Sequence, residues 1–229
     1  MIGGEPGPDC PLCPRLVAFR TDNRRQFPDW HNAPVPSFGD PGARLLIIGL
    51  APGLRGANRT GRPFTGDYAG VLLYETLQAF GFAAGNYAER ANDGLELIDC
   101  MITNAVRCVP PANKPEPAEI TTCRSFLSRT IGDLSQLRAM VLLGRIAHDT
   151  ALRTLGLKLS AYPFGHGATH RPPGAPALFD SYHCSRYNTN TGQLTPDMFR
   201  SVFSSVRNYL DNFAVETEDL HRPSRQVTI

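Results

Sequence analysis

Residues 44–50 read RLLIIGL and set the architecture, because three further runs of the same kind follow along the chain. These apolar runs occupy residues 99–106 (DCMITNAV), 139–143 (AMVLL) and 177–182 (ALFDSY). Each run is almost continuously hydrophobic instead of alternating with polar residues. That pattern is typical of strands in a parallel sheet that is covered on both faces.

Helical patterns lie between and after the apolar runs. Residues 68–80 are followed by Gly81, the residue type that takes a left-handed C-terminal cap. Residues 116–131 contain Pro117 at their start, where proline fits the first turn of a helix. Thr195 suits the N-cap of a last helix with one apolar stripe. Strands alternating with helices predict a three-layer α/β sandwich.

Three loops rich in polar and glycine residues follow strands, at residues 51–67, 104–113 and 183–192. Sheets of this class place their sites beyond the carboxyl ends of the strands, so these are the expected active-site loops. Within the first loop, residues 54–66 (LRGANRTGRPFTG) carry three arginines and no acid. Arginine suits bidentate contact with phosphate. Codon bias in a GC-rich genome together with ordinary surface charge is the simpler explanation of such a run.

The composition is that of a globular protein, with 41% hydrophobic and 19% charged residues and a net charge of only +2. At 229 residues we expect one domain, 1–229. Within it, residues 1–43 are expected to form a cysteine-bearing, proline-rich N-terminal arm, and residues 214–229 a frayed polar tail. No apolar run has the length of a membrane span, and the first residues lack the pattern of a signal peptide. We therefore expect a protein of the cytoplasm with no membrane partner. We also expect it to be a monomer.

Four of the six cysteines fall into two pairs, Cys10 with Cys13 and Cys108 with Cys123. A reducing compartment argues against disulfides, and four thiolates suit either zinc or an iron-sulfur cluster. Spacing alone does not choose between the two. The other two cysteines have no partner at ligand spacing and are expected to be structural.

Three blocks of the sequence resemble type b (family five) uracil-DNA glycosylases. They are WHNAPVPSFGDPGARLLIIGLAPGLRGANRTGRPFTGD from residue 30, ITNAVRCVPPANKPEPAEITTC from residue 102, and HCSRYNTNTGQLTP from residue 183. The resemblance implies a central four-stranded parallel sheet flanked by helices and a [4Fe-4S] cluster on the four paired cysteines. It also implies base-excision repair of DNA that contains uracil and some other damaged bases. Cys184 departs from the family, whose related loop usually carries proline, and this puts the rigidity of the loop in question.

The same resemblance gives roles to four residues of the base pocket. Phe64 matches the residue that lies against the uracil ring, and Asp67 matches the catalytic acid residue, where a carboxylate would favour a cationic sugar. His183 would donate a hydrogen bond to the base as negative charge develops on it. Asn104 has a donor and an acceptor to read the imide edge of uracil. Each residue also has a structural alternative. Phe64 would be a core residue, Asp67 a helix cap, and His183 and Asn104 parts of the scaffold.

Further residues are assigned to the base and to DNA. Backbone amides of the turn from Gly49 to Gly53 are expected to face the base oxygens or a phosphate. Ala51 stands where better-known uracil-excising families carry a polar side chain, so we expect a roomier and less selective pocket. Contacts with DNA are expected from four residues, of which the last three lie where the related loop enters the minor groove: Arg62, Arg186, Tyr187 and Asn188.

Two other functions remain open from the sequence. One is a catalytically weak or trapping lesion-binding protein on the same iron-sulfur scaffold, which would bind uracil-DNA without releasing uracil. The other is a cluster-bearing nucleic-acid binding module with no base pocket. Repeated formation of abasic sites would exclude both.

Overall fold

The central sheet of the computed structural model, which describes residues 4–220, has six strands in the order β1-β5-β2-β6-β8-β7. Four strands are parallel and fully buried: β5 (Cys100–Asn104), β2 (Leu45–Gly49), β6 (Ala139–Leu143) and β8 (Ala177–Ser181). The edges are closed by two short antiparallel strands, β1 (Phe38–Gly39) and β7 (Thr169–His170). The predicted parallel sheet is confirmed, but the number of strands is wrong. The edge strands have two residues each, too few to show a pattern.

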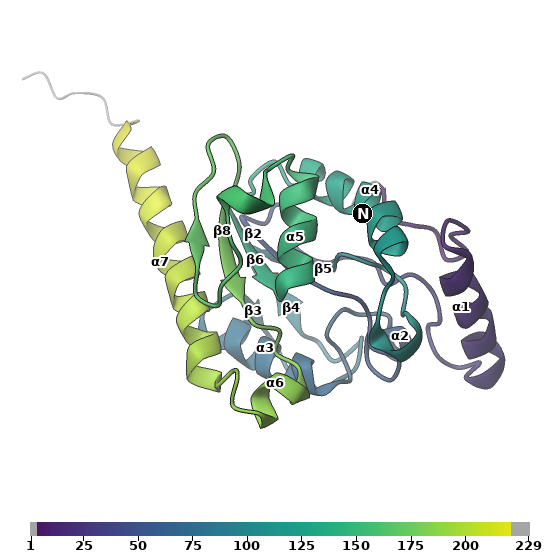
Figure 1. Ribbon diagram of the computed structural model, residues 1–229. Helices are drawn as coiled ribbons and strands as arrows, with labels where there is room; N and C mark the ends of the chain where they lie inside the picture. The colour runs from purple at the N-terminus through teal and green to yellow at the C-terminus, as the bar shows by residue number, and fades with distance from the viewer. Residues whose placement is uncertain (1–3, 221–229) are drawn as a thin grey trace, which may run out of the picture.

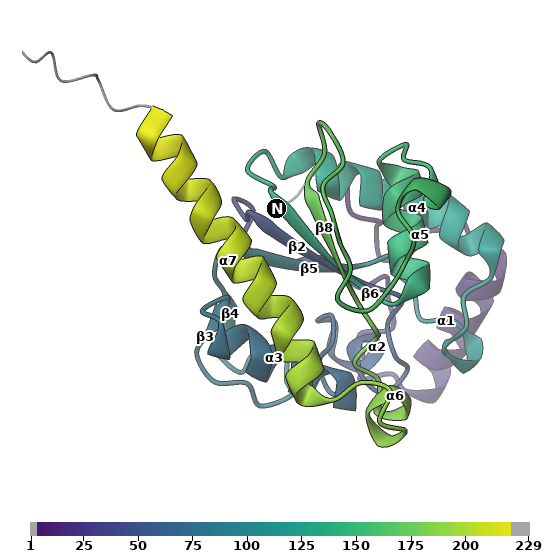
Figure 2. The same cartoon turned by 60° about the vertical axis from the view of Figure 1, so that its left-hand side comes forward.

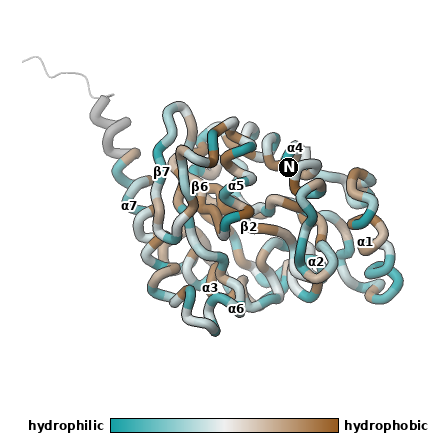
Figure 3. The backbone as a smooth tube through the Cα atoms, viewed as in Figure 1, coloured by the Kyte–Doolittle hydropathy of each residue, from teal (hydrophilic) through white to brown (hydrophobic). Residues whose placement is uncertain are grey.

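Helices cover both faces of the sheet, as Figures 1 and 2 show. One face packs against α3 (Tyr68–Ala79) and α7 (Pro196–Leu220). The other packs against α4 (Pro117–Asp133) and α5 (Arg145–Thr154). The strands between these layers are the most hydrophobic part of the backbone in Figure 3. The predicted three-layer sandwich is therefore confirmed.

The N-terminal arm contains a helix that the sequence did not predict, α1 (Pro14–Gln26), which lies at one end of the molecule in Figure 1. Its buried face includes Arg20 and Asn23 beside Leu16. The helix therefore lacks the apolar stripe by which a helix is predicted from sequence. The remaining elements are short: α2 (Ala57–Thr60), β3 (Ala83–Ala84) paired with β4 (Glu96–Leu97), η1 (Pro111–Asn113), η2 (Leu159–Ala161) and α6 (Arg186–Asn190).

The predicted helix ends agree with the structure at three places. Gly81 has a φ of 70° just beyond α3, and Pro117 is the first residue of α4. Thr195 Oγ1 accepts the Met198 N–H at 3.2 Å at the start of α7. The expected frayed tail covers residues 214–229; α7 continues to Leu220, and residues 221–229 lie outside the described part. Over residues 4–220, no helix combines the length and hydrophobicity needed to cross a membrane.

Candidate active site

A cavity of about 590 Å³ opens beyond the carboxyl ends of β2, β5 and β8. All three predicted loops reach this region, and a deeper recess shares several of the lining residues. The recess brings together six of the residues singled out from the sequence: Ala51, Gly53, Phe64, Asp67, Asn104 and His183. They come from segments far apart in the chain, so the fold itself assembles the site.

Phe64 forms one wall of the recess in a strained backbone conformation. Its φ is 51°, in the left-handed region that a bulky residue rarely adopts, and its side chain is buried. Neighbouring hydroxyls hold the segment in place. Tyr87 Oη donates to the Phe64 carbonyl at 3.2 Å, and Tyr74 Oη donates to the Pro63 carbonyl at 2.7 Å. The surrounding structure thus holds the ring in one position.

Asn104 ends β5 directly opposite Gly49 of β2. A Cβ at Gly49 would lie 2.5 Å from Asn104 Oδ1 and 2.6 Å from Phe64 Cζ, so only glycine lets the amide and the ring approach each other here. Asn104 is almost fully buried, and no group in residues 4–220 hydrogen-bonds its side chain. Asn104 lines the recess, so its unpartnered amide is available to a ligand there.

Asp67 is the N-cap of α3, as its structural alternative predicted. Its Oδ1 accepts the Gly70 N–H at 3.1 Å. Its Oδ2 lies against two loop glycines: a Cβ at Gly53 would be 3.2 Å away, and one at Gly56 would collide with the carboxylate. Burial raises the pKa of Asp67 above its ordinary value, opposed by hydrogen bonds from the backbone of Gly70 and Ala69. The cap therefore fixes a partly desolvated carboxylate at the edge of the cavity.

His183 follows β8 and faces Phe64. The two rings stack with centroids 5.8 Å apart and an interplanar angle of 27°. Burial lowers the pKa of His183 to about 4, so its imidazole is neutral at physiological pH. No hydrogen bond to the ring is formed within the described chain. A neutral imidazole carries one N–H donor and one acceptor, both unused by the protein.

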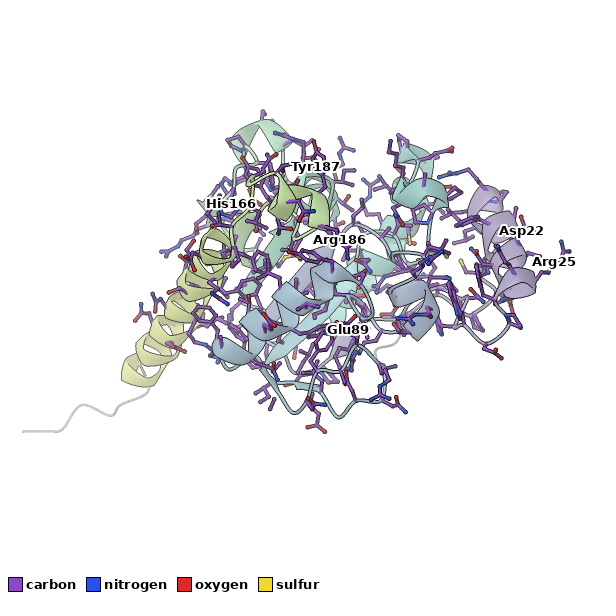
Figure 4. The ribbon with its side chains drawn as sticks, turned by 90° about the horizontal axis from the view of Figure 1, so that it is seen from below. Asp22, Arg25, Glu89, His166, Arg186 and Tyr187 are labelled. Atoms are coloured by element: carbon purple, nitrogen blue, oxygen red, sulfur yellow. The ribbon has the colours of Figure 1, made fainter. Side chains whose placement is uncertain are left out.

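The rim of the cavity is formed by α6, which faces the viewer in Figure 4. Tyr187 is 73% exposed, and Arg186 is exposed with its guanidinium 5.3 Å from the Tyr68 ring centroid. Asn188 differs from these two. Its Nδ2 donates to the His183 carbonyl at 2.8 Å, so the amide that was expected to contact DNA ties α6 to the loop of His183.

Arg62, which was predicted to contact DNA, has its side chain inside the protein. Its side chain is 3% exposed and forms a bidentate ion pair with Asp93, with both N–O distances at 2.8 Å. Arg62 Nε donates to Thr65 Oγ1 at 2.8 Å, and the guanidinium lies among aromatic rings that include Tyr74. The residue is part of the scaffold beneath the Phe64 loop, since its charge is fully engaged inside the protein.

Several residues that line the cavity were not singled out from the sequence, and two of them carry large polar side chains. Tyr68 and Arg55 both line the cavity, and both are exposed. Arg55 belongs to the arginine-rich run, and Tyr68 directly follows Asp67, so their positions in the sequence were the only indication. Neither type of side chain is unusual on a surface.

The four paired cysteines line one small cavity between α1, α4 and the connection that follows β5. The Arg107 N–H donates to Cys123 Sγ at 3.3 Å, and Arg20 Nη1 lies 3.8 Å from Cys108 Sγ. Burial raises the pKa of Cys108 to about 12 and that of Cys123 to about 11. Their sulfurs are not gathered as the ligands of one ion would be, since no three cysteine sulfurs of the described residues lie within 4.8 Å of one another. Tetrahedral zinc would hold thiolates about 3.8 Å apart.

Comparison with known proteins identifies the family. A model described as the uracil DNA glycosylase superfamily matches residues 36–207. A Type-5 uracil-DNA glycosylase of Thermus thermophilus is 47% identical over 86% of this chain and 92% of its own length. One of Mycobacterium bovis is 42% identical over 86% and 77%, and a Type-4 uracil-DNA glycosylase of Sulfurisphaera tokodaii is 31% identical over 84% and 78%. The family match includes the sheet and every residue of the recess, and the chain belongs to the uracil DNA glycosylase superfamily.

Proposed function

We propose that this chain is a monofunctional uracil-DNA glycosylase of base-excision repair, which hydrolyses the bond between the base and its sugar and leaves an abasic site. Membership of the superfamily supports the class of reaction. The observation that carries the assignment to this site is the unpartnered amide of Asn104, which lines the recess together with the Phe64 ring. A flat ring with an imide edge would stack on Phe64 and satisfy that amide.

The base must leave the helix to reach this recess. A glycosylase cannot reach the bond inside a duplex, and extrusion of the nucleotide costs ~a few kcal/mol. The exposed Tyr187 and Arg186 on the rim are suited to filling the gap in the stack and to contacting phosphate. Both project from the same short helix beside the cavity.

Cleavage develops positive charge on the sugar and negative charge on the base. The Asp67 carboxylate would stabilise the cationic sugar and orient the attacking water. His183 would donate its N–H to the base oxygen, and because the ring is neutral it does so without giving up a proton. Removing such a preorganised donor costs about 10² to 10³ in rate, so His183→Ala tests the role directly.

The pocket would accept other deaminated bases because Ala51 presents only a methyl group to the recess. Selection against an analogue is strong only where a buried polar group would be left unpaired. We expect excision of hypoxanthine or xanthine as well as uracil, with normal bases spared. Duplexes carrying each base, followed by alkali cleavage, measure this range. Ala51→Asn should narrow it, and an unchanged profile in that variant would contradict the role of Ala51.

A [4Fe-4S] cluster is proposed as the cofactor, held by Cys10, Cys13, Cys108 and Cys123. All four line one cavity, and N–H groups point at two of the sulfurs. The cluster would tie the N-terminal arm to the middle of the chain and supply no step of the reaction. The protein should be brown with about four irons per chain. Stoichiometric zinc without visible absorption would contradict this.

We further propose that the protein acts as a monomer in the cytoplasm. The recess and its rim are built entirely from one chain, and the relatives named above come from bacteria and an archaeon. Light scattering of the purified protein, alone and with a uracil-containing oligonucleotide, measures the mass of the protein in solution and so its oligomeric state. A mass of two chains would refute the monomer.

A further inference from the structure

A second group of polar side chains lies inside the protein, at the other edge of the sheet from β1. His148 on α5, His170 on β7 and Asp180 on β8 each offer a metal-ligating atom, and these atoms all lie within 4.8 Å of one another. Their side chains are 1%, 13% and 0% exposed. None of the three lines the base pocket or its recess. The glycosylase chemistry proposed above does not use them.

The hydrogen bonds of His148 leave an excess of acceptors. Its Nδ1 is 2.7 Å from Asp180 Oδ1, and its Nε2 is 2.9 Å from the Tyr162 carbonyl oxygen. A neutral imidazole has one N–H, so it satisfies only one of these oxygens. With Nε2–H donating to the carbonyl, the Nδ1 lone pair points at the carboxylate. A cation, either a proton or a metal ion, must therefore lie between His148 Nδ1 and Asp180 Oδ1.

His170 supplies the second indication. Its Nε2 is buried and has no hydrogen-bond partner, although it lies 3.4 Å from Asp180 Oδ2. A buried polar atom without a partner is rare in folded proteins and calls for an explanation such as an ion. A cation shared with Asp180 would satisfy this nitrogen and the excess acceptors of His148 at once.

From these contacts we propose that His148, His170 and Asp180 form a binding site for one divalent transition-metal ion. Two imidazole nitrogens and one carboxylate are a donor set that suits zinc. Zinc ligands at about 2.0 to 2.1 Å are roughly 3.3 Å apart, so a modest withdrawal of His148 from Asp180 accommodates the ion. Binding exchanges the proton at His148 Nδ1 for the cation, and the proton leaves to solvent.

The surroundings of the three ligands have the form of a metal site. The Nε2–H of His148 donates to the Tyr162 carbonyl, and a ligating histidine almost always donates its other N–H in this way. The Gly165 N–H lies 3.4 Å from Asp180 Oδ2. The rings of Phe164 and Tyr162 pack edge-on against the two histidines and shield them from water. The ion would therefore fix the segment between α5 and β8, which leads into the loop of His183.

The test is zinc content and zinc-dependent stability of the full chain. Wild type, His170→Gln and the control His31→Gln are stripped with a chelator, loaded with zinc and dialysed. His31 is a suitable control because it is exposed, lies outside the cluster and makes one side-chain hydrogen bond, to a backbone carbonyl. We expect His170→Gln to hold one zinc fewer per chain than wild type and His31→Gln. The unfolding temperature of wild type should rise with zinc more than that of His170→Gln.

Cobalt distinguishes this site from the cysteines and does not depend on the variant. Wild type loaded with one cobalt equivalent should show visible bands without the intense sulfur-to-cobalt absorption that thiolate ligands give. Equal zinc in wild type and His170→Gln would overturn the proposal. So would a cobalt spectrum in which every bound ion shows thiolate ligation.

Discussion

Substituting Gly49 by alanine should close the recess while leaving the chain folded. The added methyl would lie 2.5 Å from Asn104 Oδ1 and 2.6 to 2.7 Å from two carbons of the Phe64 ring. Ordinary contacts begin near 3.4 Å, so the neighbours must yield by about 0.9 Å. Phe64 has little freedom to move, because its backbone is held by Tyr87. Overpacking of this kind costs about 1–3 kcal/mol of folding free energy.

The effect on catalysis should exceed the effect on stability. A displacement of about 1 Å in a positioned group can cost on the order of 10²-fold in rate. We therefore expect single-turnover excision of uracil by Gly49→Ala to fall about 100-fold, measured well below the unfolding temperature. Gly132→Ala is the matched control, since its new methyl meets nothing within 4 Å. A rate for Gly49→Ala within a few-fold of wild type, with the protein destabilised, would refute the assignment of this recess to the base.

Four further outcomes are expected. Asp67→Asn keeps a side chain that can cap α3 and should lower single-turnover cleavage by about 10²-fold or more while binding changes little. Arg62→Ala should destabilise the fold by about 3–5 kcal/mol, by leaving Asp93 buried without its partner, and should leave the salt dependence of DNA binding unchanged. Because burial raises the pKa of Asp67 and lowers that of His183 to about 4, the rate should rise with pH through the Asp67 titration and be level around neutrality; an inflection near 6.5 would contradict a neutral His183. Arg186→Ala should weaken DNA binding and reduce the logarithmic salt slope by ~0.9 if it neutralises one phosphate, and an unchanged slope would exclude that contact.

Much of the scaffold could be predicted because buried parallel strands leave a strong hydrophobic pattern. All four central strands were found in this way, whereas β1 and β7 have only two residues each and owe their pairing to their neighbours. The helix α1 was not predicted for a different reason. Its inward face carries Arg20, which donates to the Cys10 carbonyl, so polar contacts hold the helix in place of an apolar stripe.

The site was only partly readable from the sequence. Phe64, Asp67 and His183 lie in motifs, and the fold brings them together as expected. Arg62 lies in the arginine-rich run of residues 54–66, but its burial depends on an ion pair with Asp93, which is 31 residues away in the sequence. A partner at that separation is set by tertiary packing, which no local pattern reveals. The tie between Asn188 and the loop of His183 likewise depends on how α6 folds back.

The most direct test of the function is the release of free uracil. Purified protein is incubated with a large excess of DNA that carries one uracil per molecule, and free uracil and abasic sites are counted together. We predict one uracil released for each abasic site, through many turnovers of each protein molecule. Tight binding with no uracil released, or with at most one release per chain, would contradict the account and identify a protein that traps the lesion.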